Sequence, residues 1–339
     1  MSELENVKWV VASRPEAEVR ASNFEMKREP VAPVGPGCML LKARYFTVNP
    51  PARMALVSGG IARRPIPIGA TMRGSGLAEV VESRNPDFEP GDLVMGDLGW
   101  QRYVISDGVR RRVVNKVQPR EGFPASTLLH VLGGSGATAY FGMTEYARPR
   151  VGDTLVVSTA AGNVGALVCQ LAKMQGCRVV GIAGGARKCG WLVSELGCDA
   201  AIDYKSEDVP ARLDETCPNG IDIYFDHVGG EILDAALARI AQGARVVLCG
   251  GTSQYNNDLD WYGPKNYFNL VYRQAEMTGF YVFNFRDRFE EAHSRLATLI
   301  AEGKLQYRED ILEGVENLPE ALMRLFRGDN FGTQLVHDA

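Results

Sequence analysis

The sequence has few of the residues that mark metal-binding and disulfide-rich proteins. Its 339 residues include 4 histidines and 7 cysteines, an odd number with no CxxC pair. This cysteine usage does not suggest a disulfide framework, so reduced thiols are expected. The histidines lie far apart and form no HxxxH or HExxH motif, so no local metal site is predicted.

Excess charge and long apolar runs are missing as well. The 37 lysines and arginines against 41 aspartates and glutamates give a net charge of −4, so nothing indicates binding to nucleic acid. The longest uncharged stretches, 122–144 and 154–172, contain glycines or polar amides, and no membrane span is predicted. The first ten residues carry acids where a signal peptide carries bases, so a cytoplasmic location is expected.

The hydrophobic pattern and the turn residues divide the chain into two regions. A length of 339 residues predicts about two domains. Up to about residue 125, short apolar runs are separated by Gly and Pro, which is typical of an irregular β domain. From about 153, strands alternate with helical patterns, which predicts a parallel sheet covered on both faces. We expect strands at 154–158, 178–183, 200–203, 221–225, 245–249 and 277–282, helices at 186–196, 232–240 and 288–302, and a tail after Gly303 that docks on the first domain.

The most informative segment is Ser158-Thr159-Ala160-Ala161-Gly162-Asn163-Val164-Gly165, between a predicted strand and an amphipathic helix. It is an AxGxxG form of the dinucleotide fingerprint. Gly162 lets the backbone approach a pyrophosphate, Gly165 lets helix and strand pack closely, and the helix N-terminus offers free N–H groups. The alternative is a tight strand–helix turn in another kind of α/β protein, but the strand–turn–helix–strand context favours a dinucleotide.

The end of the second predicted strand indicates which dinucleotide. An NAD site has an acid there that binds the ribose 2′-hydroxyl. This chain has Ala183-Gly184-Gly185 followed by Arg187 and Lys188, with no acid. Two cations without a carboxylate favour a 2′-phosphate, so NADP(H) is the expected cofactor; the alternative is two solvated bases in the first turn of a helix.

Five segments together resemble the medium-chain dehydrogenase/reductase superfamily, in its zinc-free branch of prostaglandin reductases and leukotriene B4 dehydrogenases. That branch includes NADPH-dependent alkenal, enone and curcumin reductases. The resemblance covers nearly the whole chain. The segments are 138–142 (TAYFG), 160–165 (AAGNVG), 225–230 (FDHVGG), 249–256 (CGGTSQYN) and 328–332 (GDNFG).

The resemblance implies an α/β fold: a GroES-like β domain from residues 1–127 and 308–339, with an inserted Rossmann domain, a doubly wound parallel sheet, at 128–307. The first domain would bind substrate and the second NADP(H). It also implies cofactor contacts for Gly162, Asn163, Val164, Gly165, Lys188, Tyr204, His227, Cys249, Gly250, Gly251, Thr252, Ser253, Tyr255, Phe280, Tyr281, Val282 and Asn330.

The zinc-dependent members of the superfamily are disfavoured as a match, because the stretch comparable to their zinc-binding segment, 73–76 (RGSG), has no His or Cys. Without a Lewis acid an alcohol dehydrogenase loses its main electrostatic support, whereas hydride addition to a conjugated C=C bond needs only hydrogen bonds to the enolate. The resemblance therefore implies NADPH-dependent reduction of the C=C bond of α,β-unsaturated aldehydes or ketones. Tyr255, after the fifth strand, is the candidate catalytic hydrogen-bond donor; it could also be a surface tyrosine.

Two departures from the family pattern affect the site. Asn49-Pro50-Pro51-Ala52-Arg53-Met54 replaces the usual Asp-Pro-Tyr-Met-Arg, so the substrate pocket is expected to differ. His227 replaces an asparagine and either keeps the loop's hydrogen bonds or donates a proton. The candidate substrate residues are Arg53, Trp100 and Tyr262; for each there is an alternative, a surface salt bridge for the first and packing for the others.

Three other functions remain open. A quinone oxidoreductase of the same superfamily would share the cofactor features, a non-catalytic module would bind NADPH without turnover, and an alcohol dehydrogenase would need zinc. The expected partner is a small enone or enal. A homodimer is common in the family, and the aromatic cluster Trp261, Tyr262, Tyr267 and Phe268 could line a pocket or a dimer seam.

Overall fold

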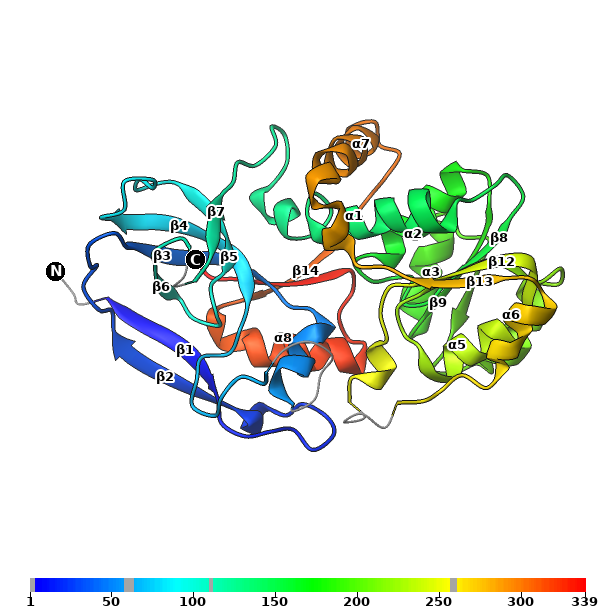
Figure 1. Cartoon of the computed structure of the whole chain (residues 1–339), viewed down its shortest axis with the longest axis horizontal. Helices are drawn as coiled ribbons and strands as arrows, with labels where there is room; N and C mark the ends of the chain where they lie inside the picture. Colours follow the sequence, from blue (N-terminus) through cyan, green and yellow to red (C-terminus); the bar gives the residue numbers. More distant parts are fainter. Residues whose placement is uncertain (1–3, 58–63, 110–111, 257–260) are drawn as a thin grey trace. The chain divides into compact units, whose positions relative to one another are not determined.

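The computed structural model describes residues 4–57, 64–109, 112–256 and 261–339. The chain forms two compact units, Met1–Leu129 with Glu309–Ala339 (unit 1) and His130–Arg308 (unit 2). Figure 1 shows the chain coloured from blue at the N-terminus to red at the C-terminus. The sequence placed the corresponding boundaries at 127/128 and 307/308. No helix in the described part of the chain is long and apolar enough to cross a membrane.

Unit 1 is built mainly on antiparallel strands, with β14 and β15 paired in parallel, and α8 is the α-helix among its described residues. Its larger sheet has the order β14-β15-β3-β4-β5-β7, with β6 also paired to β3, and β1 pairs with β2 in a separate hairpin. The tail returns as predicted, because β15 pairs antiparallel with β3. The elements are β1 (Glu5–Val11), β2 (Phe24–Pro30), β3 (Met39–Thr47), β4 (Ser75–Ser83), β5 (Leu93–Asp97), β6 (Tyr103–Ser106), β7 (Val114–Lys116), β14 (Glu309–Glu313), α8 (Leu318–Arg327) and β15 (Thr333–His337).

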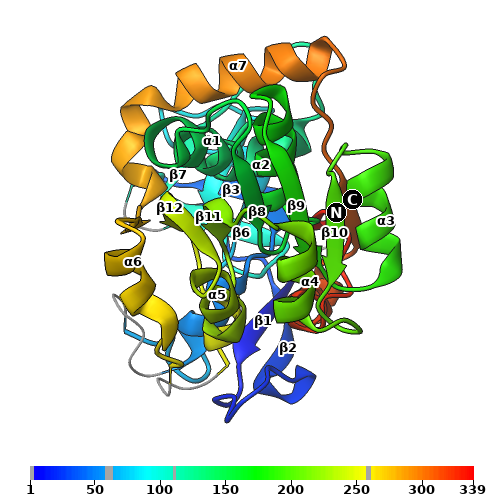
Figure 2. The same ribbon diagram turned by 90° about the vertical axis from the view of Figure 1, so that its right-hand side faces the viewer.

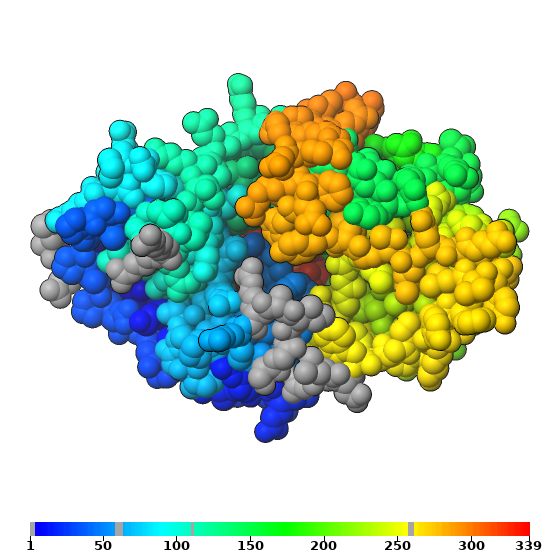
Figure 3. Space-filling view, viewed as in Figure 1, coloured from blue at the N-terminus to red at the C-terminus, as the bar shows by residue number. Residues whose placement is uncertain are grey.

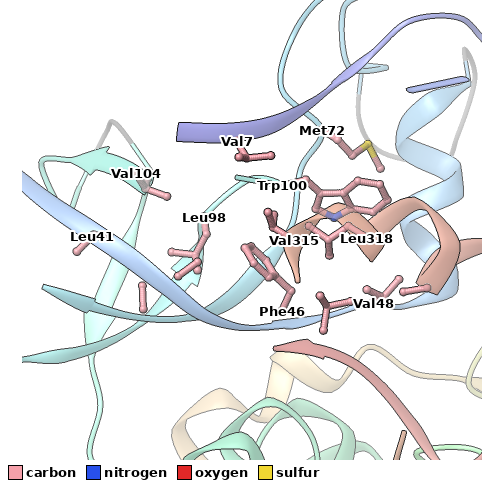
Figure 4. Packing of buried hydrophobic residues seen from close by; sticks show 14 of the residues in the cluster. Val7, Leu41, Phe46, Val48, Met72, Leu98, Trp100, Val104, Val315 and Leu318 are labelled. Atoms are coloured by element: carbon pink, nitrogen blue, oxygen red, sulfur yellow. The ribbon is translucent and has the colours of Figure 1, made fainter. Parts of the chain in front are cut away.

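The core of unit 1 lies between its sheet and α8. Phe46 of β3 and Leu98, which follows β5, belong to one buried cluster with Val315 and Leu318 of the tail. The close-up in Figure 4 shows these side chains near Trp100. The tail therefore completes this core, and the burial of its apolar side chains stabilises the returning segment. The sequence predicted short strand-like runs that correspond to β1, β3, β4, β5 and β6. It predicted no strand for β2, β7, β14 or β15 and no helix for α8.

Unit 2 has the doubly wound fold. Its six strands are all parallel, in the order β10-β9-β8-β11-β12-β13, which is the 3-2-1-4-5-6 order of dinucleotide-binding sheets. The strands are β8 (Thr154–Val157), β9 (Arg178–Ala183), β10 (Ala200–Asp203), β11 (Ile221–Asp226), β12 (Ile240–Leu248) and β13 (Glu276–Gly279). In Figure 2, α1, α2 and α7 lie on one face of the sheet and α4 and α5 on the other.

The helices of unit 2 are α1 (Gly134–Phe141), α2 (Gly165–Met174), α3 (Ala186–Ser194), α4 (Val209–Thr216), α5 (Gly230–Leu237), α6 (Asn269–Tyr272) and α7 (Phe289–Ala301). The sequence predicted no bounds for α1, α4 or α6, and it extended the helix of 232–240 into β12, which begins at Ile240. The strand order reverses between β8 and β11. Ligands of such sheets bind at the carboxyl ends of the strands beside this reversal, so the turns after β8 and β11 define the candidate site.

Candidate functional site

The turn after β8 is closed by short contacts around its glycines. Gly162 N–H donates to the carbonyl of Thr159 at 2.9 Å. A Cβ on Gly165 would lie 2.3 Å from the Thr159 oxygen, so only glycine lets α2 begin this close to the turn. Thr159 has a φ of 52°, a left-handed conformation that is uncommon for threonine. Asn163 donates from Nδ2 to Ser135 Oγ at 2.7 Å and joins the turn to α1. Val164 occupies the position before α2, with no side-chain hydrogen bond to the helix.

The turn after β11 is organised by the buried carboxylate of Asp226. Its Oδ1 accepts hydrogen bonds from Ser158 Oγ at 2.9 Å and from Tyr224 OH at 3.0 Å. The same oxygen accepts from the backbone N–H groups of Val228 and Gly229, at 3.0 and 3.1 Å. One carboxylate thus links the end of β8 to the turn after β11, so the two loops of the candidate site are fixed relative to each other.

His227 lies in this turn with its ring buried. The backbone N–H of His227 donates to Ser158 Oγ at 2.8 Å, and the ring Nδ1 lies 2.9 Å from the Ser158 carbonyl oxygen. The ring stacks on Phe225 at 5.2 Å between centroids. Burial lowers the pKa of His227 below its usual range, so the ring is neutral at neutral pH.

The segment after β12 packs against the turn that holds His227. The N–H groups of Cys249 and Gly250 donate to the carbonyl of Asp226, at 2.8 and 3.2 Å. The N–H and Oγ1 of Thr252 donate to the carbonyl of His227, and Ser253 makes the same pair of bonds to Val228. The structure therefore brings the predicted contacts 249–253 together with His227. Burial raises the pKa of the Cys249 thiol to about 12, which leaves it protonated.

Tyr255 ends the short 3-10 helix Thr252–Gln254 beside this segment. Its hydroxyl oxygen lies 3.4 Å from the Gly251 N–H, which donates to it. Burial raises the pKa of Tyr255, so the phenol keeps its proton. The hydroxyl accepts from the backbone and still has its own proton to donate.

The opposite part of the sheet edge, after β9 and β10, is more exposed. Lys188 lies in the first turn of α3, and Tyr204 directly follows β10 with 43% of its surface exposed. A Cβ on Gly184 would lie 2.9 Å from the Tyr204 ring, so this glycine allows the ring to cover the end of β9. Asp203 accepts from Gly185 N–H at 2.7 Å, and this backbone bond is the main reason that its pKa is lowered.

The third group of predicted cofactor residues follows β13. Phe280 N–H lies 3.4 Å from the Leu248 carbonyl, and the Phe280 ring stacks on Tyr146 at 4.9 Å. Tyr281 is 60% exposed, and Val282 begins a 3-10 helix that extends to Arg288. These residues continue the carboxyl edge of the sheet beyond β12.

The candidate residues of unit 1 lie deeper than a ligand-binding role suggests. Trp100 is 1% exposed, and its ring lies 5.1 Å from that of Phe24 within the core (Figure 4). Arg53 is fully buried and donates from Nη2 to the Ala17 carbonyl at 2.8 Å. The surface salt bridge considered for Arg53 is therefore wrong, and the placement of Trp100 favours its packing role. Asn330 donates from Nδ2 to the Gly332 carbonyl at 2.9 Å.

Tyr262 belongs to unit 2, where its hydroxyl already has a partner. It donates to Asp234 Oδ2 on α5 at 2.9 Å, and its backbone N–H donates to Gln254 Oε1 at 2.7 Å. Because both polar groups fasten the loop to neighbouring elements, the placement favours a loop-anchoring role over a substrate contact.

Sequence reasoning overlooked Asp226, Ser158 and Asp203. Each lies at the carboxyl end of an apolar strand. An acid at the end of a fully buried strand needs partners, and this was the available signal for Asp226. Within the described residues, no group of three or more His, Cys, Asp or Glu side chains is arranged to hold a metal ion.

Comparisons with known proteins agree with this architecture. Residues 7–114 match the N-terminal domain of oxidoreductases, and residues 163–298 match the family described as zinc-binding dehydrogenase. The chain is 39% identical over 330 residues to a putative NADP-dependent oxidoreductase, YfmJ, of Bacillus subtilis, covering 96% of each chain. It is 37% identical over 339 residues to the NADPH-dependent curcumin reductase of Escherichia coli, covering 98% of this chain and 97% of that one.

Among solved structures, the chain resembles CurA of Vibrio vulnificus in complex with NADPH, with a TM-score of 0.91 and 37% identity over 98% of this chain and 99% of that one. Similarity of this extent covers both units. The chain belongs to the medium-chain dehydrogenase/reductase superfamily, in its zinc-independent branch of prostaglandin, alkenal and curcumin reductases.

Proposed function

We propose that this protein uses NADPH to reduce the C=C bond of α,β-unsaturated aldehydes or ketones. One observation carries the proposal. The sheet edge of unit 2 has the strand order, the glycine turn and the Asp226–His227 loop of a dinucleotide site, and the chain is 37% identical along its length to an NADPH-dependent curcumin reductase. Enones are the substrate class that this relationship favours.

Three features of unit 2 fit NADP(H). Gly162 and Gly165 close the turn that would hold the pyrophosphate before α2. Gly185 has a φ of 92°, and no described atom lies within 4 Å of where its Cβ would be, so the space beside it is open. Lys188 would bind the 2′-phosphate there, with Tyr204 covering the end of β9.

NADPH, when bound, supplies the hydride for the β-carbon of the substrate. The chain's own contribution is to hold charge and position. Tyr255 would donate its hydroxyl proton in a hydrogen bond to the oxygen on which negative charge develops, because the phenol stays protonated and its oxygen is oriented by the Gly251 N–H. Water would protonate the α-carbon. Orientation and this hydrogen bond supply the acceleration.

The test is NADPH consumption by the purified, chelator-treated protein with enals, enones and quinones, with products identified by mass spectrometry. Saturated aldehydes or ketones from the conjugated substrates are expected. Consumption with quinones alone would replace the proposal with a quinone oxidoreductase. Tight NADPH binding with no acceptor reduced would favour a module that binds the cofactor without turnover.

We also propose that the protein is a homodimer joined at β13. This strand is the last in the order of the described sheet, so one of its edges is open to a second copy. Apolar side chains are exposed beside it, on the yellow-to-orange segment at the surface in Figure 3. They are Tyr267, Phe268, Val271, Tyr272, Tyr281 and Phe283.

Light scattering tests the dimer. The wild type is expected at twice the chain mass of 37.1 kDa, and Tyr272→Asp, at a side chain that is 71% exposed, is expected to shift it toward the monomer. Val151→Asp is the matched control, because Val151 is 88% exposed and lies before β8 rather than beside β13. A monomeric wild type would remove the dimer from the account.

A further inference from the structure

The carboxylate of Asp203 joins the loop after β10 to the loop after β9. Its Oδ1 accepts hydrogen bonds from the backbone N–H groups of Gly185, at 2.7 Å, and of Lys205, at 3.0 Å. Its Oδ2 accepts from Ser206 Oγ at 2.8 Å. Gly185 lies 18 positions before Asp203, and β9 and β10 are paired in parallel, so the first of these bonds ties together the carboxyl ends of two neighbouring strands.

Gly185 is the residue from which α3 begins. Its carbonyl accepts the backbone N–H groups of Lys188 and Cys189, at 3.1 and 3.2 Å, and these bonds form the first turn of the helix. Gly185 has a φ of 92° and no side chain to cap the helix, so its own conformation restrains the turn weakly. The bond from its N–H to Asp203 supplies that restraint and fixes the start of the helix that carries Lys188.

The charge of Asp203 has the wrong sign for a phosphate site. The bond from the Gly185 N–H is the main cause of the lowered pKa of Asp203, so the carboxylate is ionised at neutral pH. A carboxylate near Lys188 would weaken the binding of a phosphate by Coulomb repulsion. Both carboxylate oxygens, however, are engaged by donors of the chain itself. This combination indicates that Asp203 acts through its hydrogen bonds and not through its charge.

We propose that Asp203 is a positioning residue for cofactor selection, whose carboxylate holds the Gly185 N–H and thereby sets where Lys188 presents its ammonium group to the 2′-phosphate. The inference rests on the proposed NADPH-dependent function. Asp203 needs no contact with the cofactor, because its effect passes through the backbone of Gly185 to the first turn of α3. The effect is therefore specific for the cofactor that carries the phosphate.

The test is the ratio of the dissociation constants of NADPH and NADH, measured by fluorescence titration of the full-length protein. Asp203→Ala removes the acceptor, and we expect it to raise the NADPH constant about 3- to 10-fold and to leave the NADH constant within a factor of about 2. Asp203→Asn keeps an oxygen that can accept from Gly185 but removes the charge, so it is expected to keep the wild-type ratio within a factor of about 2. Equal effects of the two variants, or a ratio that Asp203→Ala leaves unchanged, would overturn the inference.

Asp199→Ala is the matched control. Asp199 directly precedes β10, and its Oδ2 accepts from the backbone N–H of Val179 on β9 at 2.7 Å. It therefore joins the same two strands at the amino edge of the sheet, as Asp203 does at the carboxyl edge. Asp199→Ala is expected to leave the ratio of the two constants within a factor of about 2 of the wild type. A change equal to that of Asp203→Ala would assign the effect to a general loosening of β10 and would overturn the inference.

A double-mutant cycle tests whether the effect passes through Lys188. In the Lys188→Ala background, the further change Asp203→Ala is expected to alter the NADPH constant by less than about 2-fold, because the cation that Asp203 positions is gone. An undiminished loss in the double variant would overturn the inference.

Enone reduction by the wild type separates this inference from the proposed function. If the wild type reduces enones with NADPH while Asp203→Ala leaves the ratio unchanged, only the inference fails. If the ratio changes as expected and no acceptor is reduced, only the proposed reaction fails. If the wild type binds no NADPH, both fail.

Discussion

The loops after β9 and after β11 lie at the same edge of one sheet, yet they differ in burial and in charge. The region after β9 is solvent-facing and basic, with Lys188 in the first turn of α3 and Tyr204 43% exposed. The region after β11 is buried, with the carboxylate of Asp226 and the neutral ring of His227 held in a closed hydrogen-bond network.

The difference shows that one sheet edge can combine a charged, partly exposed loop with a closed, hydrogen-bonded one. Charge at a partly exposed loop acts over a distance that salt screens. A buried carboxylate acts through hydrogen bonds whose donors are costly to leave unpaired. Substitutions after β9 should therefore change cofactor selection with little loss of stability, whereas substitutions after β11 should change stability first.

The largest expected effect comes from removing the buried carboxylate. Asp226→Ala leaves four donors without their acceptor and is expected to lower the free energy of unfolding by about 3–5 kcal/mol. Asp203→Ala, at the end of β10, removes a partly exposed acceptor of Gly185 N–H, Lys205 N–H and Ser206 Oγ, whose donors water can reach, and is expected to cost no more than about 1 kcal/mol. Urea unfolding of both variants measures this contrast. Equal losses would mean that the two loops do not differ as described.

The next effect concerns the charge at the exposed loop. Lys188→Ala is expected to raise the NADPH dissociation constant about 10- to 100-fold and to leave that of NADH within a factor of about 2, because only NADPH carries the 2′-phosphate. Raising the salt concentration should shrink the effect. Fluorescence titration at two salt concentrations measures it. Lys173→Ala, whose ammonium pairs with Asp199, is the control. An equal loss for both cofactors would remove Lys188 from the 2′-phosphate site.

A smaller change is expected at the buried part of the edge, in catalysis. Tyr255→Phe removes the hydroxyl but keeps the ring, so turnover should fall by about 10-fold or more while NADPH binding changes little. Steady-state kinetics with an enone, together with NADPH titration, separates the two quantities. Undiminished turnover would remove Tyr255 from the mechanism.

The smallest expected effect is a pH dependence of stability. Burial lowers the pKa of His227 in the folded protein, so below pH 6.5 the unfolded chain binds a proton that the folded chain resists. The stabilisation is present above pH 6.5 and falls as the pH drops below it, by at most about 1 kcal/mol between pH 6.5 and 5.5. Unfolding at both pH values should show this loss in the wild type and not in His227→Asn. The same loss in both proteins would assign it to other groups.

The sequence predicted what short-range patterns determine. The apolar strands and the spacing of Gly162 and Gly165 indicated the doubly wound sheet and its turn, and the lack of an acid after Ala183 indicated NADP(H). These signals are local, because each depends on residues within a single strand–turn–helix unit.

Long-range contacts decided the rest. The anchoring role that the structure favours for Tyr262 depends on Asp234, 28 positions earlier. The tautomer of His227 depends on a carbonyl 69 positions earlier, and the burial of Trp100 depends on Phe24 and on the returning tail. Such partners come together only in the folded chain, so residue type and spacing could not reveal them.

The central claim is that NADPH, bound at the sheet edge of unit 2, transfers a hydride to a carbon–carbon double bond of the substrate. The most direct measurement uses NADPH with both C4 hydrogens of the nicotinamide replaced by deuterium, together with a simple enone, followed by NMR of the product. The account predicts a saturated ketone with deuterium on the β-carbon. Deuterium on the carbinol carbon of an unsaturated alcohol, or consumption of NADPH with no deuterium in the organic product, would contradict it.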